Sequence, residues 1–183
     1  MGQIRFQSAS SPVLPIQDPQ RLPQLGLTLP ELLISVVIVG LLSAIALPNY
    51  MNSIKATRQK DVANQIANIQ TSIAAYREEF LANPAGWKDL WRIAPVNTNK
   101  DPSQNPPPKD ISKEESFTPI QSANGGAYTI STQNSGNIFI LIGTPNEKGS
   151  ALWDIKACLN TQTGLSDIQL GNPSKTVATP VCT

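Results

Sequence analysis

The sequence predicts an α+β fold, in which one long N-terminal helix packs on a small antiparallel sheet. Residues 27–82 have the pattern of a continuous helix, first uncharged and apolar and then amphipathic at helical period. Residues 83–126 are irregular and predict a long connecting loop. Residues 127–170 hold four short strand-like segments separated by turns, the pattern of an antiparallel meander. The apolar face of the sheet is expected to cover the helix.

The composition disfavours common enzyme classes. The chain has 183 residues, a net charge of +1, two Cys and no His. Absence of His removes the commonest general base and metal ligand, and two Cys cannot build a four-Cys zinc site. The net charge gives no general electrostatic footprint for nucleic acid. We therefore predict no catalytic residue, no cofactor, no metal site and no nucleic-acid partner.

The chain opens with a polar stretch and then becomes apolar abruptly. Residues 1–26 contain four Pro and show no period of 2 or 3.6, so they are expected to be unstructured. Residues 27–47 form a helix-length apolar run that is uncharged from Leu32 onward. Twenty-one helical residues span about 32 Å, against a hydrocarbon core of roughly 30 Å. Without residues 27–31 the run has only 16 residues, which is short for a bilayer. It therefore predicts a membrane span only if Glu31 lies within or near its N-terminal edge.

Glu31 has three interpretations. Thr28-Leu29-Pro30-Glu31 matches a capping box, with Thr28 as N-cap and Glu31 at the third helical position. Alternatively, Glu31 sits at the level of the lipid headgroups, or it pairs with a cation on another subunit. An ionised carboxylate deep in hydrocarbon costs roughly a few kcal/mol or more. The capping role does not exclude the intersubunit pair.

An ordinary export signal is a competing interpretation of this segment. Ala44-Ile45-Ala46 would serve as its cleavage site. Against it, the n-region would end in the acidic Glu31, and the bases before the run, Arg5 and Arg21, do not adjoin it.

Beyond Pro48 the helix is expected to continue as an amphipathic one. Apolar side chains recur at intervals of 4, 3, 4, 3 and 4 residues and predict core packing. These are Val62, Ile66, Ile69, Ile73, Tyr76 and Phe80. The polar residues between them, including Gln65 and Gln70, are expected to face solvent, and Asn83-Pro84 to end the helix.

The rest of the chain predicts short elements. Trp87 and Trp91 are four residues apart, so a short helix over residues 87–93 is expected to pack both rings on the long helix. A low-complexity polar stretch follows over residues 97–115. The expected strands are 127–132, 138–143, 151–159 and 165–170, with turns at 133–137, 145–149 and 160–164.

Gly26 and the sequence after it, LTLPELLISVVIVGLLSAIALPNY, resemble the class III leader and N-terminal helix of type IV pilins and pseudopilins. The family pattern is a Gly, an apolar residue, Thr, Leu, any residue, Glu and about twenty apolar residues. The resemblance implies that Gly26 is the last leader residue and Leu27 the new, N-methylated N-terminus. Glu31 matches the family's Glu, and Gly40 and Pro48 match positions where the family's helix is often weakened.

The chain departs from the pattern in two ways. Leu27 stands where Phe is commonest, and the leader is long, with Arg21 as the base nearest the cleavage point. Pro30 resembles a variant often seen in cyanobacterial members.

The resemblance implies a structural subunit rather than an enzyme. A prepilin peptidase would expose the amine of Leu27, which also receives the methyl group. The amine could then pair with Glu31 of a neighbouring copy in a helical filament. The resemblance further implies other pilins as partners, an assembly platform with a separate ATPase, and an inner-membrane protomer with its N-terminus inside. The local charges do not themselves favour that orientation.

Cys158 and Cys182 suit a disulfide in an exported domain. Their bridge would resemble the C-terminal disulfide loop of many pilins, closing about 25 residues and contributing about 3 kcal/mol. Two buried free thiols are the alternative. Asp154 and Asp167 could join a calcium site of the kind found in some pseudopilins, although few acidic residues lie near them in the sequence.

Two other functions stay open at this point. One is a pseudopilin of a type II-like secretion system, which forms a short periplasmic piston. The other is a secreted or membrane-tethered binding domain that does not polymerise. Adhesion, motility, DNA uptake and secretion are all compatible with a filament of this kind.

Overall fold

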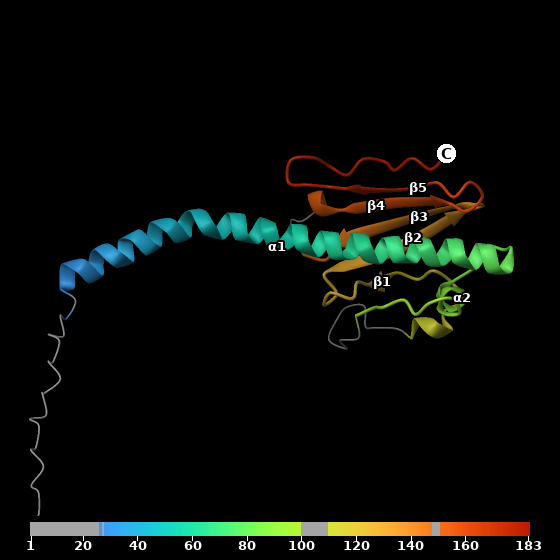
Figure 1. The fold of residues 1–183 in the computed structure, drawn as a ribbon, viewed down its shortest axis with the longest axis horizontal. Helices are drawn as coiled ribbons and strands as arrows, with labels where there is room; N and C mark the ends of the chain where they lie inside the picture. Colours follow the sequence, from blue (N-terminus) through green and yellow to red (C-terminus); the bar gives the residue numbers. More distant parts are fainter. Residues whose placement is uncertain (1–25, 27, 100–109, 148–150) are drawn as a thin grey trace, which may run out of the picture. The chain divides into compact units, whose positions relative to one another are not determined.

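The computed structural model describes residues 26, 28–99, 110–147 and 151–183, which Figure 1 draws as a coloured ribbon. The predictions for the leader before Gly26 and for Leu27 lie outside the described residues. The chain divides into two compact units, Met1–Ser43 and Ala44–Thr183, which are described separately. The architecture is the predicted α+β one, with a long N-terminal helix and a five-stranded antiparallel sheet.

Helix α1 spans Leu29–Phe80 and runs through Pro48. It ends two residues before the predicted boundary because Leu81 adopts a left-handed conformation, with φ of 55°. The N–H of Leu81 still donates to Arg77 O at 2.9 Å, which is the last helical bond. A left-handed residue at this position is a common way to end a helix, although Gly usually occupies it.

The sheet is a meander with strand order β1-β2-β3-β4-β5, and each strand pairs antiparallel with the next. Its strands are β1 (Ile120–Gln121), β2 (Tyr128–Ser135), β3 (Ile138–Pro145), β4 (Ile155–Asn160) and β5 (Ser166–Leu170). Figure 1 shows the C-terminal half of α1 lying across one face of this sheet.

The strand boundaries differ from the predicted ones at both ends of several strands. β3 continues through Pro145, and β4 through Asn160, into residues that were expected to be turns. Residues 133–135 were expected to be a turn, but they extend β2, because a two-residue loop at Gly136-Asn137 brings Ser135 opposite Ile138. Gly136 has a φ of 60°, as the first loop position of a type II′ hairpin requires. Residues 151–153 form a 3₁₀ turn instead of the start of a strand, and the short β1 was not predicted.

The core forms where α1 meets the sheet. Val62, Ile66, Ile69 and Ile73 are at most 1 % exposed, and Tyr76 is also buried, so the apolar stripe packs as predicted. Inward-facing side chains of the strands complete the cluster: Tyr128, Ile130, Phe139, Leu141, Ile155, Ala157 and Leu159. Phe80 was predicted to belong to the stripe, but it is 39 % exposed because the helix ends there.

Two glutamines of α1 lie inside this interface. Gln70, which was expected to face solvent, is buried and its Nε2 donates to Cys158 O at 2.7 Å. Gln59 is also buried, and its Nε2 donates to Gly171 O at 2.8 Å and Trp153 O at 3.0 Å. These amides fix the position of α1 on the sheet.

The short helix α2 (Trp87–Trp91) confirms the predicted element, but only one of its tryptophans is in the core. Trp87 is fully buried, its ring meets Phe117 edge to face, and its Nε1 donates to Thr118 O at 2.7 Å. Trp91 is 42 % exposed, so the prediction that both rings pack is wrong. Beyond α2, the polar stretch contains a 3₁₀ turn at Ile111–Lys113, and its residues 100–109 lie outside the described part.

Candidate processing and assembly segment

The start of α1 agrees with the backbone part of the predicted cap. The N–H of Leu32 donates to Thr28 O at 3.1 Å, and the helix begins at Leu29. Thr28 therefore occupies the N-cap position, Pro30 lies in the first turn, where no N–H donor is needed, and Glu31 is the third helical residue. The reciprocal side-chain bonds of the capping box stay a prediction. Gly26, just before the helix, is exposed, and nothing lies within 4 Å of the place where a Cβ would stand.

The apolar part of α1 is exposed within the part of the chain that the structure describes. Every large apolar side chain from Leu32 to Leu47 is at least 51 % exposed. An 18-residue window of α1 has a mean hydropathy of 2.3, and none of that window is buried. Contiguous apolar surface of this extent marks a membrane or protein interaction site, because water exposure of such surface is unfavourable. The helix is long and apolar enough to cross a membrane.

The serine hydroxyls in the apolar run are satisfied inside the helix. Ser35 Oγ donates to Glu31 O at 2.7 Å, and Ser43 Oγ donates to Val39 O at 2.7 Å. Bonds of this i to i−4 type leave no hydroxyl donor in need of water, which suits burial in lipid or in a bundle of helices.

Glu31 is the exception to this pattern. Its side chain is exposed, and it is the single charged residue between Thr28 and Ile54. Within the described residues, ion pairs join Lys55 to Glu147, Lys88 to Glu115 and Lys113 to Asp110, and Glu31 takes part in none of them.

Gly40 and Pro48 are both exposed in the part of the chain that the structure describes. Nothing lies within 4 Å of the place where a Cβ on Gly40 would stand, so a close approach that requires Gly there must come from outside the described chain. Pro48 is inside α1 and lacks the N–H that would donate to Ala44 O. The helix is nevertheless continuous through both positions.

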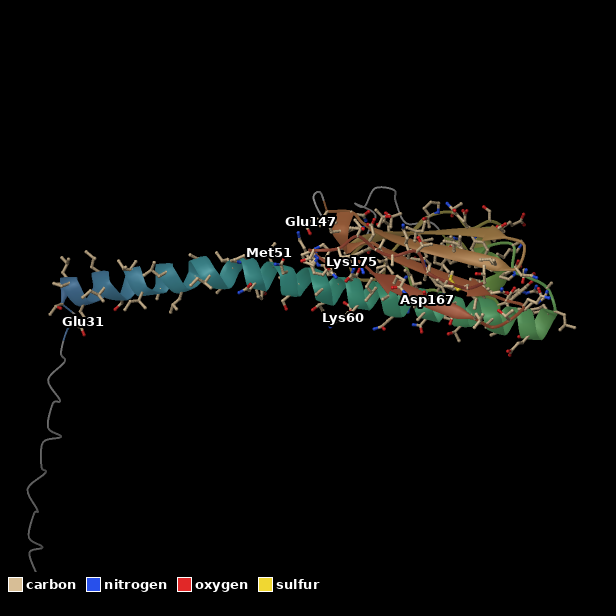
Figure 2. The ribbon with its side chains drawn as sticks, turned by 90° about the horizontal axis from the view of Figure 1, so that it is seen from above. Glu31, Met51, Lys60, Glu147, Asp167 and Lys175 are labelled. Carbon is tan, nitrogen blue, oxygen red and sulfur yellow. A yellow bond between two sulfur atoms is a disulfide. The ribbon has the colours of Figure 1, made fainter. Side chains whose placement is uncertain are left out.

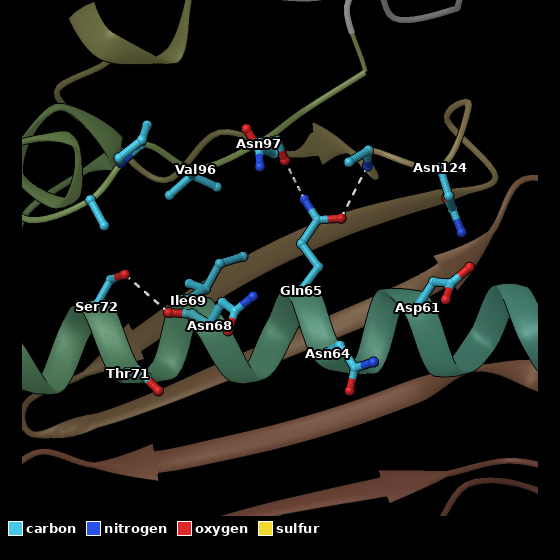
Figure 3. A pocket seen from close by; sticks show the side chains of 13 residues that line it. Asp61, Asn64, Gln65, Asn68, Ile69, Thr71, Ser72, Val96, Asn97 and Asn124 are labelled. Atoms are coloured by element: carbon cyan, nitrogen blue, oxygen red, sulfur yellow. Dashed lines mark hydrogen bonds between the residues drawn. The ribbon is translucent and has the colours of Figure 1, made fainter.

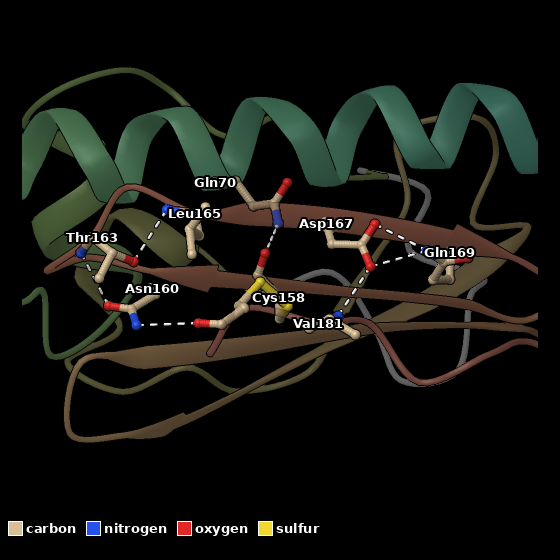
Figure 4. The surroundings of a disulfide bond; sticks show 9 residues. Gln70, Cys158, Asn160, Thr163, Leu165, Asp167, Gln169 and Val181 are labelled. Atoms are coloured by element: carbon tan, nitrogen blue, oxygen red, sulfur yellow. Dashed lines mark hydrogen bonds between the residues drawn. A yellow bond between two sulfur atoms is a disulfide. The ribbon is translucent and has the colours of Figure 1, made fainter.

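The head carries the disulfide expected from the sequence. Cys158 and Cys182 are bonded, with Cα atoms 6.0 Å apart, which excludes the alternative of two free thiols (Figure 4). Two further contacts hold the C-terminal segment: Asn160 Nδ2 donates to Cys182 O at 3.1 Å, and the N–H of Val181 donates to Asp167 Oδ2 at 3.0 Å. Hydrogen bonds from the Gln169 side chain and from Val181 lower the pKa of the Asp167 carboxyl.

The two aspartates considered for a calcium site are not brought together. Asp167 lies opposite Cys158, whereas Asp154 precedes Ile155, whose partner is Leu170 at the other end of β5. Burial raises the pKa of Asp154, which disfavours the charged form that a cation would need. Among the described residues there is no group of three or more His, Cys, Asp or Glu side chains that could hold a metal ion.

A groove of about 650 Å³ runs between the polar side of α1 and the loops that follow α2 and β1 (Figure 3). Gln65, which was expected to face solvent, bridges it: its Nε2 donates to Asn97 O, and its Oε1 accepts from the N–H of Ala123. Amide and hydroxyl groups form most of the polar lining, and Asp61 is its one carboxylate among the described residues. The groove therefore assembles no acid–base pair.

Comparison with known families agrees with the sequence resemblance. Residues 21–47 match the prokaryotic N-terminal methylation motif, which is the leader signature of type IV pilins and pseudopilins. The match begins before the Gly26–Leu27 bond and ends at the last residue of the apolar run. Comparison of the chain with curated proteins and with solved structures gave no match.

Proposed function

We propose that the chain is the precursor of a type IV pilin-like filament subunit, cut after Gly26 and assembled through its N-terminal helix. The observation that carries the proposal is the register of Gly26, Glu31 and the bare apolar helix face, at the position of the methylation motif. Peptide hydrolysis after Gly26 would leave a free amine on Leu27, four residues before Glu31. Methylation of that amine keeps its positive charge.

The charge pair explains why a carboxylate stands at the edge of an apolar surface. When the Leu32–Leu47 faces of several copies pack together, Glu31 leaves water and needs a cation. The amine of Leu27 on a neighbouring copy supplies one. Each copy brings one amine and one carboxylate, so the pairing repeats from copy to copy. The partners of this process are a prepilin peptidase that also methylates Leu27, an assembly platform with a separate ATPase, and other copies or other pilins.

Before assembly, the proposed location is the bacterial inner membrane, with residues 27–47 spanning the bilayer and the N-terminus inside. Tyr50, three residues after Leu47, would then lie near the membrane–water interface, where tyrosine is enriched. The head would face an oxidising compartment, which suits the Cys158–Cys182 disulfide.

Mass spectrometry of the mature N-terminus tests the cleavage. A chain that starts at a methylated Leu27 agrees with the proposal. A start at Leu47 would identify an ordinary exported protein, and an intact Met1 a simple membrane anchor.

A substitution at Glu31 tests the assembly. We expect Glu31→Gln to be inserted and cleaved, but to appear in sheared surface filaments about a hundredfold less, because the amine would lose its buried partner. The matched control is Asp61→Asn, which removes an exposed carboxylate of the head. Normal incorporation of Glu31→Gln into filaments would contradict the pairing. Wild-type filaments that stay within the periplasm would identify a pseudopilin.

A further inference from the structure

The Ala44–Thr183 unit exposes apolar side chains at two separate places on α1. At its start, Leu47, Tyr50 and Met51 have the i, i+3, i+4 spacing of one helix face and are all exposed. We call these three residues the neck patch. At the other end of the helix, Phe80 and Leu81 form what we call the tip. Met51 and Leu81 are 30 residues apart, about 45 Å along a helix.

The tip is held in place by its surroundings. The Phe80 ring lies 4.5 Å from that of Tyr76, and the Arg92 guanidinium lies 5.1 Å from the Phe80 centroid. Leu81 is 81 % exposed and has a φ of 55°, and its O accepts from Arg77 Nη1 at 2.9 Å. A left-handed conformation is unfavourable for Leu, and exposure of its side chain adds to the cost. A strained and exposed residue of this kind points to a binding role.

A hollow at the base of the head lies directly beyond the neck patch. It has a volume of about 260 Å³ and is lined by Lys55, Arg58, Pro145, Glu147 and Trp153, among others. Because Arg58 is seven residues after Met51, it lies on the same face of α1 as the neck patch. Figure 2 shows Glu147 at the end of the head that is nearest Met51. The hollow and the neck patch therefore share one face of α1 at the base of the head, and we call them together the corner.

The charges at the two places are complementary. In the corner, Lys55 Nζ lies 3.9 Å from Glu147 Oε1, and Arg58 is an additional exposed cation. At the tip, Arg77 and Arg92 contact Leu81 O and the Phe80 ring. The carboxylates of Glu78 and Glu79 are exposed there, and among the described residues neither takes part in an ion pair. Glu79, directly before Phe80, is therefore the anion that the tip can present to the exposed cation of the corner, Arg58.

We propose that the tip of one copy docks in the basal corner of the next copy, a contact that rests on the proposed filament function. Leu81 fills the hollow, and Glu79 faces Arg58. The two surfaces differ and lie at opposite ends of one unit, so the contact is heterologous: each added copy leaves one tip and one corner free, and the contact propagates as an open filament. The patches are small, so this contact orders the heads and acts together with the bundle of N-terminal helices.

Cysteine cross-linking in intact filaments tests the contact. In chains that carry both Leu81→Cys and Met51→Cys, mild oxidation is expected to give a ladder of covalent multimers on a non-reducing gel. Chains with either cysteine alone are expected to give no ladder. The matched control is Leu81→Cys with Gln133→Cys, which places the second thiol at an exposed position on β2. A ladder from the control as well, or cross-links only to a different protein, would overturn the inference.

Two further sets of variants separate docking from folding. Leu81→Gly relieves the strained backbone, so we expect the head to unfold at the same or a higher temperature, while the filament yield falls about tenfold. Arg58→Glu and Glu79→Arg are each expected to lower the yield about fivefold, and the double variant to restore it. Unchanged yields in all of these would overturn the docking and leave the proposed function standing. If the unmodified chain is cleaved but forms no filament, the proposed function itself fails.

Discussion

The buried amide of Gln59 gives a sharp test of how α1 is held on the sheet. Its side chain donates to the carbonyl oxygens of Gly171, Trp153 and, at 3.4 Å, Asp154. The perturbation is Gln59→Leu, which keeps a side chain of similar size and removes the donors. We expect this variant to be destabilised, because an acceptor inside the interface loses its partner.

The magnitude follows from which carbonyls have a second donor. Trp153 O also accepts from the Tyr128 hydroxyl at 3.1 Å, and Asp154 O accepts from the N–H of Gly171 at 2.9 Å. For Gly171 O, Gln59 is the donor found among the described residues, so Gln59→Leu leaves this carbonyl oxygen unsatisfied. One buried unsatisfied acceptor costs about 1–3 kcal/mol. We therefore expect the free energy of unfolding to fall by about 2 kcal/mol, which lowers the melting temperature of a head of about 140 residues by about 6 °C.

Thermal unfolding of the detergent-solubilised full chain, followed by tryptophan fluorescence, measures this change. The control is Asn68→Leu on the exposed side of the same helix, which is expected to change the stability by no more than about 0.5 kcal/mol. Gln59→Glu places an acceptor against the same carbonyls and is expected to cost at least as much as Gln59→Leu. If Gln59→Leu and the wild-type chain have the same melting temperature, the argument that this amide holds the helix on the sheet is refuted.

Three further predictions concern the head. Reduction of the Cys158–Cys182 disulfide, which spans 24 residues, is expected to lower the unfolding free energy by about 3 kcal/mol, measured as a shift in the urea midpoint. Burial, with a smaller contribution from Asp154, raises the pKa of Tyr128 from 10.0 to about 12. Because the phenol ionises at a lower pH in the unfolded chain, the free energy of unfolding is expected to fall as the pH rises from 10 to 12. Tyr128→Phe is expected to flatten that pH profile. Gly171→Ala places a Cβ 2.1 Å from Leu152 O, so a loss of about 2 kcal/mol or more is expected in the same urea assay.

The helix and its buried stripe could be predicted because the signal is local. Val62, Ile66, Ile69 and Ile73 are spaced so that any helix places them on one face, whatever covers that face. The methylation motif could be identified for a similar reason, since Gly26 and Glu31 stand in a fixed register with the apolar run. The sheet order also followed from the sequence, because short turns between successive strands favour a meander.

The buried glutamines could not be predicted from polarity alone. Gln59 lies three residues before Val62, and Gln70 four residues after Ile66, so both sit on the buried side of α1 in helical projection. That position was the available signal. What decides their burial is the presence of free carbonyl oxygens on the sheet, at Gly171 and at Cys158, and those belong to residues about 90 to 110 positions away. For Gln70, side-chain polarity predicted solvent exposure, and long-range hydrogen bonding overrode it.

The prediction of a turn at residues 133–135, where β2 in fact continues, failed for a different reason. Gln133, Asn134 and Ser135 have low strand propensity, so residue type predicted a turn. The pairing with β3 continues through them because the tight loop at Gly136 requires the strands to stay in register up to it. The end of α1 shows the opposite case, since the chain turns at Leu81, a residue type that gives no signal for a left-handed conformation.

The two halves of α1 differ in what covers their apolar side chains, and this difference links cleavage to assembly. The stripe around Ile66 is covered by the chain's own sheet, whereas the surface from Leu32 to Leu47 is covered by nothing in the chain's described residues. A cover for it must come from outside the described residues, and an apolar cover makes the carboxylate at its edge more costly to bury. On the proposed function, the neighbouring copies that cover this surface in the filament bring a cation to Glu31. On the proposed cleavage, the peptidase creates that cation at Leu27 in every copy, so an uncut chain would lack the charge that lets the bare helices pack.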